Sequence, residues 1–296
     1  MNYEMISDYK DNKMYRDSFN KLAESTFDIN FEEWFRSGFW NDKYVCYSYI
    51  DNNEVISNVS INKMNLIYQG ENYSALQIGT VMTHPNYRGQ GLAKNLLNHV
   101  IAKYEDQYDF LYLFANDTVL DFYPKFGFER IEESSFTVDA CNLKKKASKL
   151  KKLNPDNKTD FQLISRIVSK RAPLSNILDV KESEDLLMFY VLIALKNELY
   201  YLEELDVIIL MEQEGTDLYV LDILSTKKTR CGGSSKLSFY QKKLKQSIFF
   251  LRQKKANTLM RLISLKRKIC CLCVQMCLQV KITSYFQRPL TLDFQV

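Results

Sequence analysis

The sequence predicts an α/β fold with a mixed sheet, in which parallel and antiparallel strands share one core. Three observations predict it. Residues 44–83 are rich in β-branched and aromatic residues on either side of turn sequences, which is typical of antiparallel strands. The stretch after Arg88 changes to a helical period. Residues 110–114, FLYLF, then form a short apolar run, which is typical of a buried parallel strand.

The elements follow in order along the first half of the chain. We expect a short strand near residues 3–8 and two helices over residues 12–40. The sequences KYVCYSYI, EVISNVSINKMNLIYQ and SALQIGTVMT predict three strands, because the turns DNN and QGEN separate them. These strands form an antiparallel meander.

The central helix is predicted from apolar residues at three-to-four spacing, and it runs to about Tyr108. Those residues are Leu92, Leu96, Leu97, Val100, Ile101 and Tyr104. The strand at 110–114 follows, parallel to the strand before the helix. A short helix is expected around Thr118 to Lys125 with Gly127 as its stop, and FERIEESSFTV supplies one or two closing strands.

Composition divides the chain into four segments. Residues 1–142 form the first domain, and the lysine-rich residues 143–158 read as a linker that ends in Asn-Pro-Asp. Residues 159–226 predict two helices and a hairpin around the turn EGTD, which is a second, incomplete α/β domain. Its outline repeats that of the first domain and hints at an internal duplication. Residues 227–296 form an irregular basic segment.

The basic segment has an unusual composition. It holds 16 Lys and Arg but one acid, a net charge of +15, whereas the first 226 residues sum to −11. Three explanations remain open: a basic arm for nucleic acid or membrane, a soft-metal site at CC-x-C-x3-C, or a reading-frame slip near Ser225. We favour the frame slip, because the second domain stops in mid-pattern. The slip predicts poor packing and protease sensitivity, and a compact core would contradict it. That core would use Ile248, Phe249, Phe250, Leu262 and Leu265.

Several classes of protein are not expected from this sequence. The N-terminus lacks the basic start and apolar run of a signal peptide, and the late apolar stretch ICCLCVQMCLQV is too short to span a bilayer. The seven cysteines do not form a secreted disulfide framework. We therefore expect a cytoplasmic protein that does not enter the membrane.

The sequence THPNYRGQGLAKNLL places a bare turn at the start of the central helix. Amides at a helix N-terminus lack internal partners and carry a partial positive charge, so an anion is favoured there. Gly89 and Gly91 remove side chains from this approach, and Arg88 adds a cation. The segment therefore predicts a pyrophosphate cradle. The dinucleotide fingerprint fails at Lys94, which replaces its third glycine, and the Gly-Lys-Ser/Thr of a P-loop is absent.

The same segment resembles the acetyl-CoA motif of the GNAT acetyltransferases. Arg88-Gly89-Gln90-Gly91-Leu92-Ala93 fits the pattern [RQ]-x-x-G-x-[GA], and Val81 to Tyr87 fit the phrase that precedes it. A second motif follows at Asn116, Phe122-Tyr123 and Gly127-Phe128. The resemblance covers residues 3 to 140 and implies a GNAT-like first domain. The second, incomplete domain loosely resembles that of the Eis-like branch, in which a second GNAT-like domain follows the first.

The resemblance implies a role for each matching residue. The backbone of the strand before the helix would pair with the pantetheine arm, the following amides would hold the pyrophosphate, and Asn116 would contact the cofactor. The cofactor-binding residues are then Val81, Met82, Thr83, Arg88, Gly89, Gln90, Gly91, Leu92, Ala93 and Asn116. Tyr123 would act as the general acid that protonates the departing CoA thiolate. The rival interpretation of Tyr123 is an aromatic residue of the core.

The implied activity is transfer of an acetyl group from acetyl-CoA to a primary amine, by direct attack in a ternary complex and without a metal. The acceptor would be a small molecule or a peptide, and self-association into a homo-oligomer remains open. The alternatives are a non-catalytic acyl-CoA-binding or sensing protein and, against the acidic charge of the body, a nucleic-acid-binding protein. No nucleic acid or membrane partner is expected.

The general base is not assigned by the sequence. Glu32 and Glu33 stand beside the aromatic residues Phe31, Trp34, Phe35 and Trp40, which form either an acceptor wall or a helix face packed on the sheet. His84 and His99 are expected to be structural.

Overall fold

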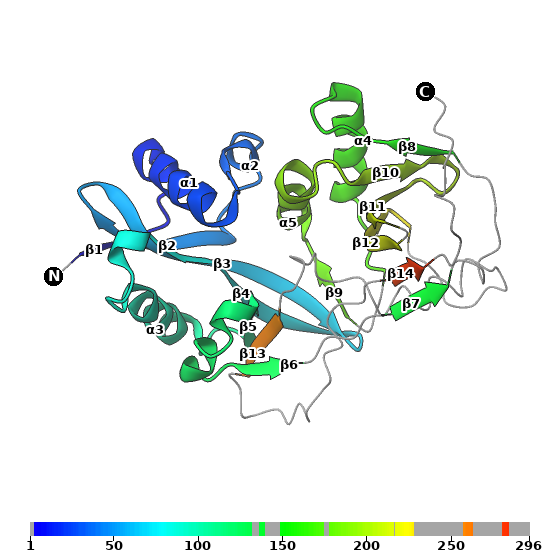
Figure 1. Ribbon diagram of the computed structural model, residues 1–296. Helices are drawn as coiled ribbons and strands as arrows, with labels where there is room; N and C mark the ends of the chain where they lie inside the picture. Colours follow the sequence, from blue (N-terminus) through cyan, green and yellow to red (C-terminus); the bar gives the residue numbers. More distant parts are fainter. Residues whose placement is uncertain are drawn as a thin grey trace. The chain divides into compact units, whose positions relative to one another are not determined.

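The computed structural model describes residues 3–131, 136–139, 149–174, 178–215, 217–227, 257–262 and 280–283. The chain forms two compact units. The first contains Met1–Glu132, Val180–Ala194 and Gln253–Val274, and the second contains Glu133–Asp179, Leu195–Arg252 and Gln275–Val296. Each unit has a sheet of its own (Figure 1).

The sheet of the first unit has the order β1-β2-β3-β4-β5-β13-β6, and β9 pairs with β3. Its strands are β1 Glu4–Ser7, β2 Tyr44–Asp51, β3 Glu54–Tyr68, β4 Glu71–Thr83, β5 Phe110–Ala115, β6 Glu129–Ile131, β9 Leu178–Lys181 and β13 Asn257–Leu262. β2, β3 and β4 are antiparallel neighbours, and β4 and β5 are parallel. The predicted meander and the predicted parallel strand are both confirmed.

Three helices cover this sheet. α1 (Lys13–Phe27) and α2 (Glu32–Arg36) lie over one face, and α3 (Leu92–Tyr104) lies over the other (Figure 1). α1 begins at Asn12, whose side chain accepts hydrogen bonds from the amides of Met14 and Tyr15. α3 ends at Tyr104 rather than near Tyr108.

A hydrophobic core of the first unit lies between α3 and the sheet. The apolar face of α3 is buried against side chains from the central strands of the sheet, as the helical period predicts. The residues of this core cluster are Val45, Tyr47, Val59, Ile61, Leu76, Ile78, Leu96, Leu97, Val100, Ile101, Tyr104, Leu111, Leu113, Ala115, Tyr123, Phe126 and Phe128. This cluster fixes the N-terminus of α3 beside the end of β4.

The connection after β5 differs from the predicted single helix. Two short 3-10 turns, Asp117–Val119 and Tyr123–Phe126, occupy it. Gly127 ends the second turn with a φ of 79°, the left-handed conformation that favours glycine. The closing segment then divides, because β6 joins the first sheet whereas β7 (Phe136–Asp139) joins the second.

The second unit is built on the sheet β7-β14-β12-β11-β10-β8. Its other strands are β8 Leu150–Lys152, β10 Leu199–Leu202, β11 Val207–Glu214, β12 Asp217–Ser225 and β14 Val280–Thr283. The hairpin of β11 and β12 around the EGTD turn is as predicted. α4 (Lys158–Ser169) contacts these two strands.

Two boundaries differ from those expected. Leu150–Lys152 lies within the predicted linker but pairs with β10, so part of that segment is a strand. α5 (Glu184–Phe189) and the wider helical turn Tyr190–Ala194 lie in the predicted second domain but belong to the first unit. The reason is tertiary, since the indole Nε1 of Trp34 donates to the carbonyl of Asp185 at 2.8 Å.

The basic segment 227–296 is described only in part. It supplies β13, between β5 and β6, and β14, between β7 and β12. Ile248, Phe249, Phe250 and Leu265, whose packing would contradict a frame slip, lie outside the described residues. The frame slip stays a prediction. Among the helices described, none is long and apolar enough to cross a membrane.

Candidate functional site

The edge of β4 is exposed to a ligand beyond the point where its pairing with β5 ends. The parallel register runs from Ala75 opposite Phe110 to Ile78 opposite Leu113, whereas β4 continues to Thr83. Among the described residues, the stretch 79–83 therefore pairs with β3 only. A strand edge of this kind can form hydrogen bonds with an extended ligand. The predicted pairing of Val81, Met82 and Thr83 with a pantetheine arm requires such an edge. The side chain of Met82 is buried, so only its backbone is available.

The predicted cradle lies between β4 and α3. Gly89 and Gly91 have φ values of 78° and 77°, which residues with a Cβ rarely adopt. Among the described residues, the amides of Gly89, Gln90 and Gly91 have no hydrogen-bond partner, and no side chain caps α3. A Cβ added at either glycine would meet nothing within 4 Å, so the turn is not crowded by the rest of the protein on that side. The loop therefore offers free donors at the positive end of a helix, which fits a diphosphate.

Three side-chain contacts fix the cradle. The guanidinium Nε of Arg88 donates to the carbonyl of Thr83 at 3.2 Å. The hydroxyl of Tyr87 donates to Asp51 at 2.8 Å, and this carboxylate raises the pKa of Tyr87. The hydroxyl of Tyr3 donates to the side chain of Gln90 at 3.2 Å. Sequence reasoning missed Tyr3 and Asp51, because each is a single polar residue far from the motif.

The remaining residues of the motif have different roles. Leu92 is buried and anchors the first turn of α3, and Ala93 is half-buried beside it, so the predicted role of each in the site falls to its backbone. Asn116 is exposed at the end of β5. Its Oδ1 accepts hydrogen bonds from the amide and the hydroxyl of Thr118 at 3.1 and 2.6 Å. The structure thus shows Asn116 as a cap of the following turn, and its Nδ2 makes no bond to a described residue.

Tyr123 is buried but keeps an uncommitted hydroxyl. The residue is 6% exposed, and its ring makes edge contacts with Phe122 and Phe128 at 5.2 and 6.2 Å. Burial raises the pKa of Tyr123 to about 12. Its hydroxyl has no hydrogen-bond partner among the described residues, and burial is the only cause of its raised pKa. Val81 packs against the same core cluster, so two of the predicted site residues share one region of the fold.

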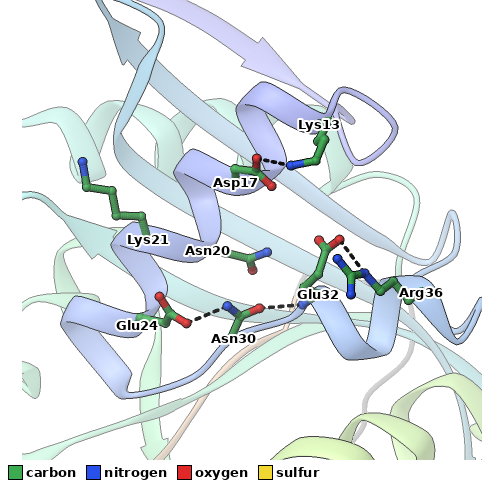
Figure 2. A pocket seen from close by; sticks show the side chains of 8 residues that line it. All are labelled: Lys13, Asp17, Asn20, Lys21, Glu24, Asn30, Glu32 and Arg36. Carbon is green, nitrogen blue, oxygen red and sulfur yellow. Dashed lines mark hydrogen bonds and ion pairs between the residues drawn. The ribbon is translucent and has the colours of Figure 1, made fainter.

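A separate polar pocket lies between α1 and α2 (Figure 2), with a cavity volume of about 230 Å³. Its lining residues are Lys13, Asp17, Asn20, Lys21, Glu24, Asn30, Glu32 and Arg36. Most of their charges are paired: Lys13 binds Asp17 at 2.5 Å, and Arg36 binds Glu32 at 3.1 Å. None of these residues belongs to the predicted cofactor site.

Glu32 is a poor candidate for the general base. Arg16 Nε donates to its carboxylate at 2.9 Å, and this bond, with that of Arg36, lowers the pKa of Glu32. A carboxylate held between two guanidinium groups has little tendency to accept a proton.

The aromatic cluster beside Glu32 is part of the core and not an acceptor wall. Phe31, Trp34 and Trp40 are only 2–4% exposed. Phe189 stacks on Phe31 with ring centroids 5.2 Å apart and contacts Trp34 edge-on at 5.6 Å. These three rings leave almost no surface for a substrate, whereas Phe35 is half-buried, with the guanidinium of Arg16 3.7 Å from its ring centroid.

His84 has a structural role, as the sequence predicts, whereas the role of His99 stays a prediction. Nδ1 of His84 accepts a hydrogen bond from the amide of Asn86 at 3.3 Å and so caps the turn after β4. His99 is exposed on α3, with its ring centroid 5.7 Å from that of Tyr47. Within the described ranges, no three His, Cys, Asp or Glu side chains gather as metal ligands would.

Comparisons with known proteins identify a family model and similar folds. The family model described as an acetyltransferase (GNAT) domain matches residues 10–131. A probable N-acyltransferase from Enterococcus faecalis V583 is 14% identical, with a TM-score of 0.55 over 90% of this chain and 73% of that one. A GCN5-related N-acetyltransferase from Kribbella flavida is 16% identical, with a TM-score of 0.50 over 88% and 72%. At these identities the likeness shows the fold alone. No curated protein matches the sequence.

Proposed function

Residues 10–131 are a GNAT acetyltransferase domain, and from this premise we propose that the protein transfers an acetyl group from acetyl-CoA to a primary amine. The acceptor is the amine of a small molecule or of a peptide. The domain supports acyl transfer in general, and the proposal adds the donor, the bond formed and the residues that act.

The glycine-lined cradle is the observation that carries the proposal. The free amides of Gly89, Gln90 and Gly91 meet the N-terminus of α3, which favours a diphosphate on electrostatic grounds. The β4 edge at 79–83 lies directly before this cradle in the chain and suits an extended amide-containing arm. A diphosphate joined to such an arm is the chemistry of CoA.

The chemical step needs no nucleophile from the protein. The lone pair of the neutral amine attacks the thioester carbonyl, the new C–N bond forms, and the C–S bond breaks. The amine loses one proton, and the thiolate that leaves gains one. We assign the second proton to Tyr123, whose hydroxyl is protonated at all physiological pH values because burial raises its pKa to about 12.

The high pKa of Tyr123 limits how the proton moves. An ordinary thiol has a pKa of about 8.5, so full transfer from this phenol to a thiolate is uphill. Tyr123 therefore acts first as a hydrogen-bond donor that stabilises charge on the sulfur as the C–S bond lengthens. The proton released by the amine passes to solvent, since the pKa of Glu32 is lowered, and solvent returns one proton to Tyr123 to complete the turnover.

A screen of amines tests the proposed function. The purified protein is mixed with acetyl-CoA and a panel of primary amines and N-terminal peptides, and the free thiol is followed over time. We expect thiol release that depends on particular amines and a product heavier by one acetyl group. Tight CoA binding without turnover of any amine would instead support a sensing protein and contradict the proposal.

A further inference from the structure

Thr80 has an unusual backbone conformation in the middle of β4. Its φ is 49°, in the left-handed region, which a β-branched residue seldom adopts. Such a conformation persists only where the surrounding structure holds it, and it is common at ligand-binding sites. No sequence signal marks it, because turn residues such as Asn or Gly are the ones expected at positive φ.

The conformation belongs to a β-bulge. On β3, Ser60 is opposite Gly79 and Asn58 is opposite Met82, so Thr80 and Val81 together face the single residue Val59. The bulge follows directly after Ile78, where the pairing of β4 with β5 ends. A bulge redirects the strand that contains it, so this one sets the direction of the free edge before the cradle.

Two buried side chains hold Thr80 in place. Nδ2 of Asn58 donates to the carbonyl of Thr80 at 2.8 Å, and the hydroxyls of Tyr44 and Thr80 are 2.6 Å apart. Both are rigid supports. Asn58 is 0% exposed, and its side chain also bonds to Ser48 at 2.8 Å and to Ser60 at 2.9 Å.

Tyr44 is held by its ring. The ring stacks on Phe31 at 5.8 Å and makes edge contacts with Trp34 and Trp40 at 5.3 and 5.6 Å. Burial raises the pKa of Tyr44, so its hydroxyl remains protonated. The aromatic cluster thus has a consequence for β4 although it offers almost no surface to a substrate.

A buried polar network needs a specific reason, because apolar residues would fill the same space without loss of hydration. Here two members of the network, Asn58 and Tyr44, bond directly to one strained residue at the site. We infer that Asn58 and Tyr44 are positioning residues: they hold the Thr80 bulge and thereby aim the backbone of Val81 and Thr83 at the pantetheine arm of CoA. This inference rests on the proposed function, because it takes CoA as the ligand of the β4 edge.

Tyr44→Phe is the variant that tests the inference, since it keeps the packed ring and removes only the hydroxyl. Tyr47→Phe is its matched control: this residue also lies on β2, and its buried hydroxyl bonds to that of Tyr104 at 2.7 Å, among the side chains that pack on α3. We expect Tyr44→Phe to raise the Kd for CoA about tenfold, while Tyr47→Phe changes it less than about twofold. The melting temperatures of the two variants should be similar.

A rescue separates positioning from general loss of stability. Glycine adopts positive φ without steric cost, so a bulge with Gly at position 80 needs no support. The double variant Tyr44→Phe, Thr80→Gly should therefore recover CoA affinity to within about threefold of the unmodified protein. The inference is wrong if Tyr44→Phe binds CoA as well as Tyr47→Phe does, or if Thr80→Gly gives no recovery.

Hydrogen exchange without ligand keeps the inference separate from the proposed function. Tyr44→Phe should speed exchange at the amides of residues 79–83, and Tyr47→Phe should not. If the unmodified protein gives no CoA binding at all, both the proposed function and the inference fail. If it binds CoA and the exchange at 79–83 is the same in both variants, only the inference fails.

Discussion

At the scale of single residues, two glycines decide whether the cradle can form. Gly89 and Gly91 have positive φ, and the space in front of each is open, so glycine is required there by the backbone and not by crowding within the protein. The sequence predicts Arg88, Gly89, Gln90 and Gly91 as site residues because the motif is local. Thr80, Asn58 and Tyr44 could not be found in this way, because strand register brings them together.

Gly91→Ala should weaken CoA binding at least tenfold, because a Cβ strains the turn at this positive φ and so displaces the amides. The strain alone costs about 1–2 kcal/mol of the free energy of unfolding. Gly70→Ala is the control, since Gly70 has a φ of 86° and equally open space but lies in the turn between β3 and β4. Calorimetric titration with CoA should show a loss of affinity in the first variant only. Equal affinities of the two variants for CoA would contradict the proposed role of the cradle.

Tyr123→Phe should lower kcat by about a hundredfold and leave the Kd for CoA within about twofold, because the hydroxyl acts only as the sulfur departs. Tyr104→Phe is the control, a tyrosine of the same core cluster that is also 6% exposed. The pH dependence of activity gives a second test of this role. The pKa of Tyr123 is raised to about 12, so its titration should cause no fall in activity up to about pH 10. A kcat that is unchanged by Tyr123→Phe would assign the tyrosine to the core alone.

At the scale of elements, the sequence predicts what local periodicity determines. β2 to β5 and α3 are found in the predicted order, because alternation and a helical period are written in consecutive residues. The sequence predicts the ends of elements less accurately than their order. For example, α3 ends at Tyr104 and not near Tyr108. The assignment of Val180–Ala194 to the first unit could not be predicted, because it depends on contacts such as that of Phe189 with Phe31.

An ion pair joins α4 to the turn before β11 in the second unit. The guanidinium of Arg166 binds the Asp206 carboxylate through both nitrogens, and Tyr201 donates to it at 2.9 Å. The hydrogen bonds from Arg166 are the largest cause of the lowered pKa of Asp206, about 2 against the ordinary 3.8. A carboxyl whose pKa is lowered by folding stabilises the protein above its ordinary pKa, and this contribution is lost as the pH falls through about 2.

Asp206→Asn should therefore lower the free energy of unfolding of the second unit at neutral pH. Because Arg166 is 43% exposed, solvent screening limits the loss to about 1 kcal/mol. The difference from the unmodified protein should shrink as the pH falls below about 4. Denaturant unfolding across this range measures it. Asp156→Asn is the control, since its side chain is 64% exposed against 29% for Asp206, and its single bond to Lys196 should contribute less. A loss that is independent of pH would contradict the electrostatic explanation.

At the scale of the whole molecule, composition indicates two different parts, and the structure shows two units that do not follow the same boundary. Chain segments from three regions make up each unit. Sequence patterns describe residues that are neighbours along the chain, so they do not predict two units whose chain segments alternate. The reading-frame slip that would explain residues 227–296 stays a prediction, and resequencing of the coding region near Ser225 tests it.

The stability of the second unit should depend on pH through a buried carboxyl on β12. Burial is the main cause that raises the pKa of Asp222 to about 7, and the charge of Arg171 opposes it while that of Asp179 adds to it. The folded protein then keeps a proton that the unfolded chain releases above about pH 4. Stability should fall as the pH rises from about 4 to 7.

Asp222→Asn should remove this dependence and raise the free energy of unfolding at pH 8 by about 1–2 kcal/mol. Asp179→Asn is the contrasting variant of the same cluster. Its carboxylate binds Arg171 at 2.8 Å and the amide of Leu174 at 2.6 Å, so its loss should destabilise the unit. Thermal unfolding at several pH values compares the two. If both substitutions change the free energy of unfolding in the same direction, burial of an ionised Asp222 does not destabilise the unit and the explanation is wrong.

Titration calorimetry with CoA and with pantetheine tests the central claim most directly. The claim is that amides exposed by Gly89 and Gly91 hold the diphosphate of CoA, and pantetheine has the arm without the diphosphate. We predict saturable binding of CoA at one site and binding of pantetheine that is weaker by about a hundredfold or more. Equal affinity for the two ligands, or no heat with CoA, would contradict the claim.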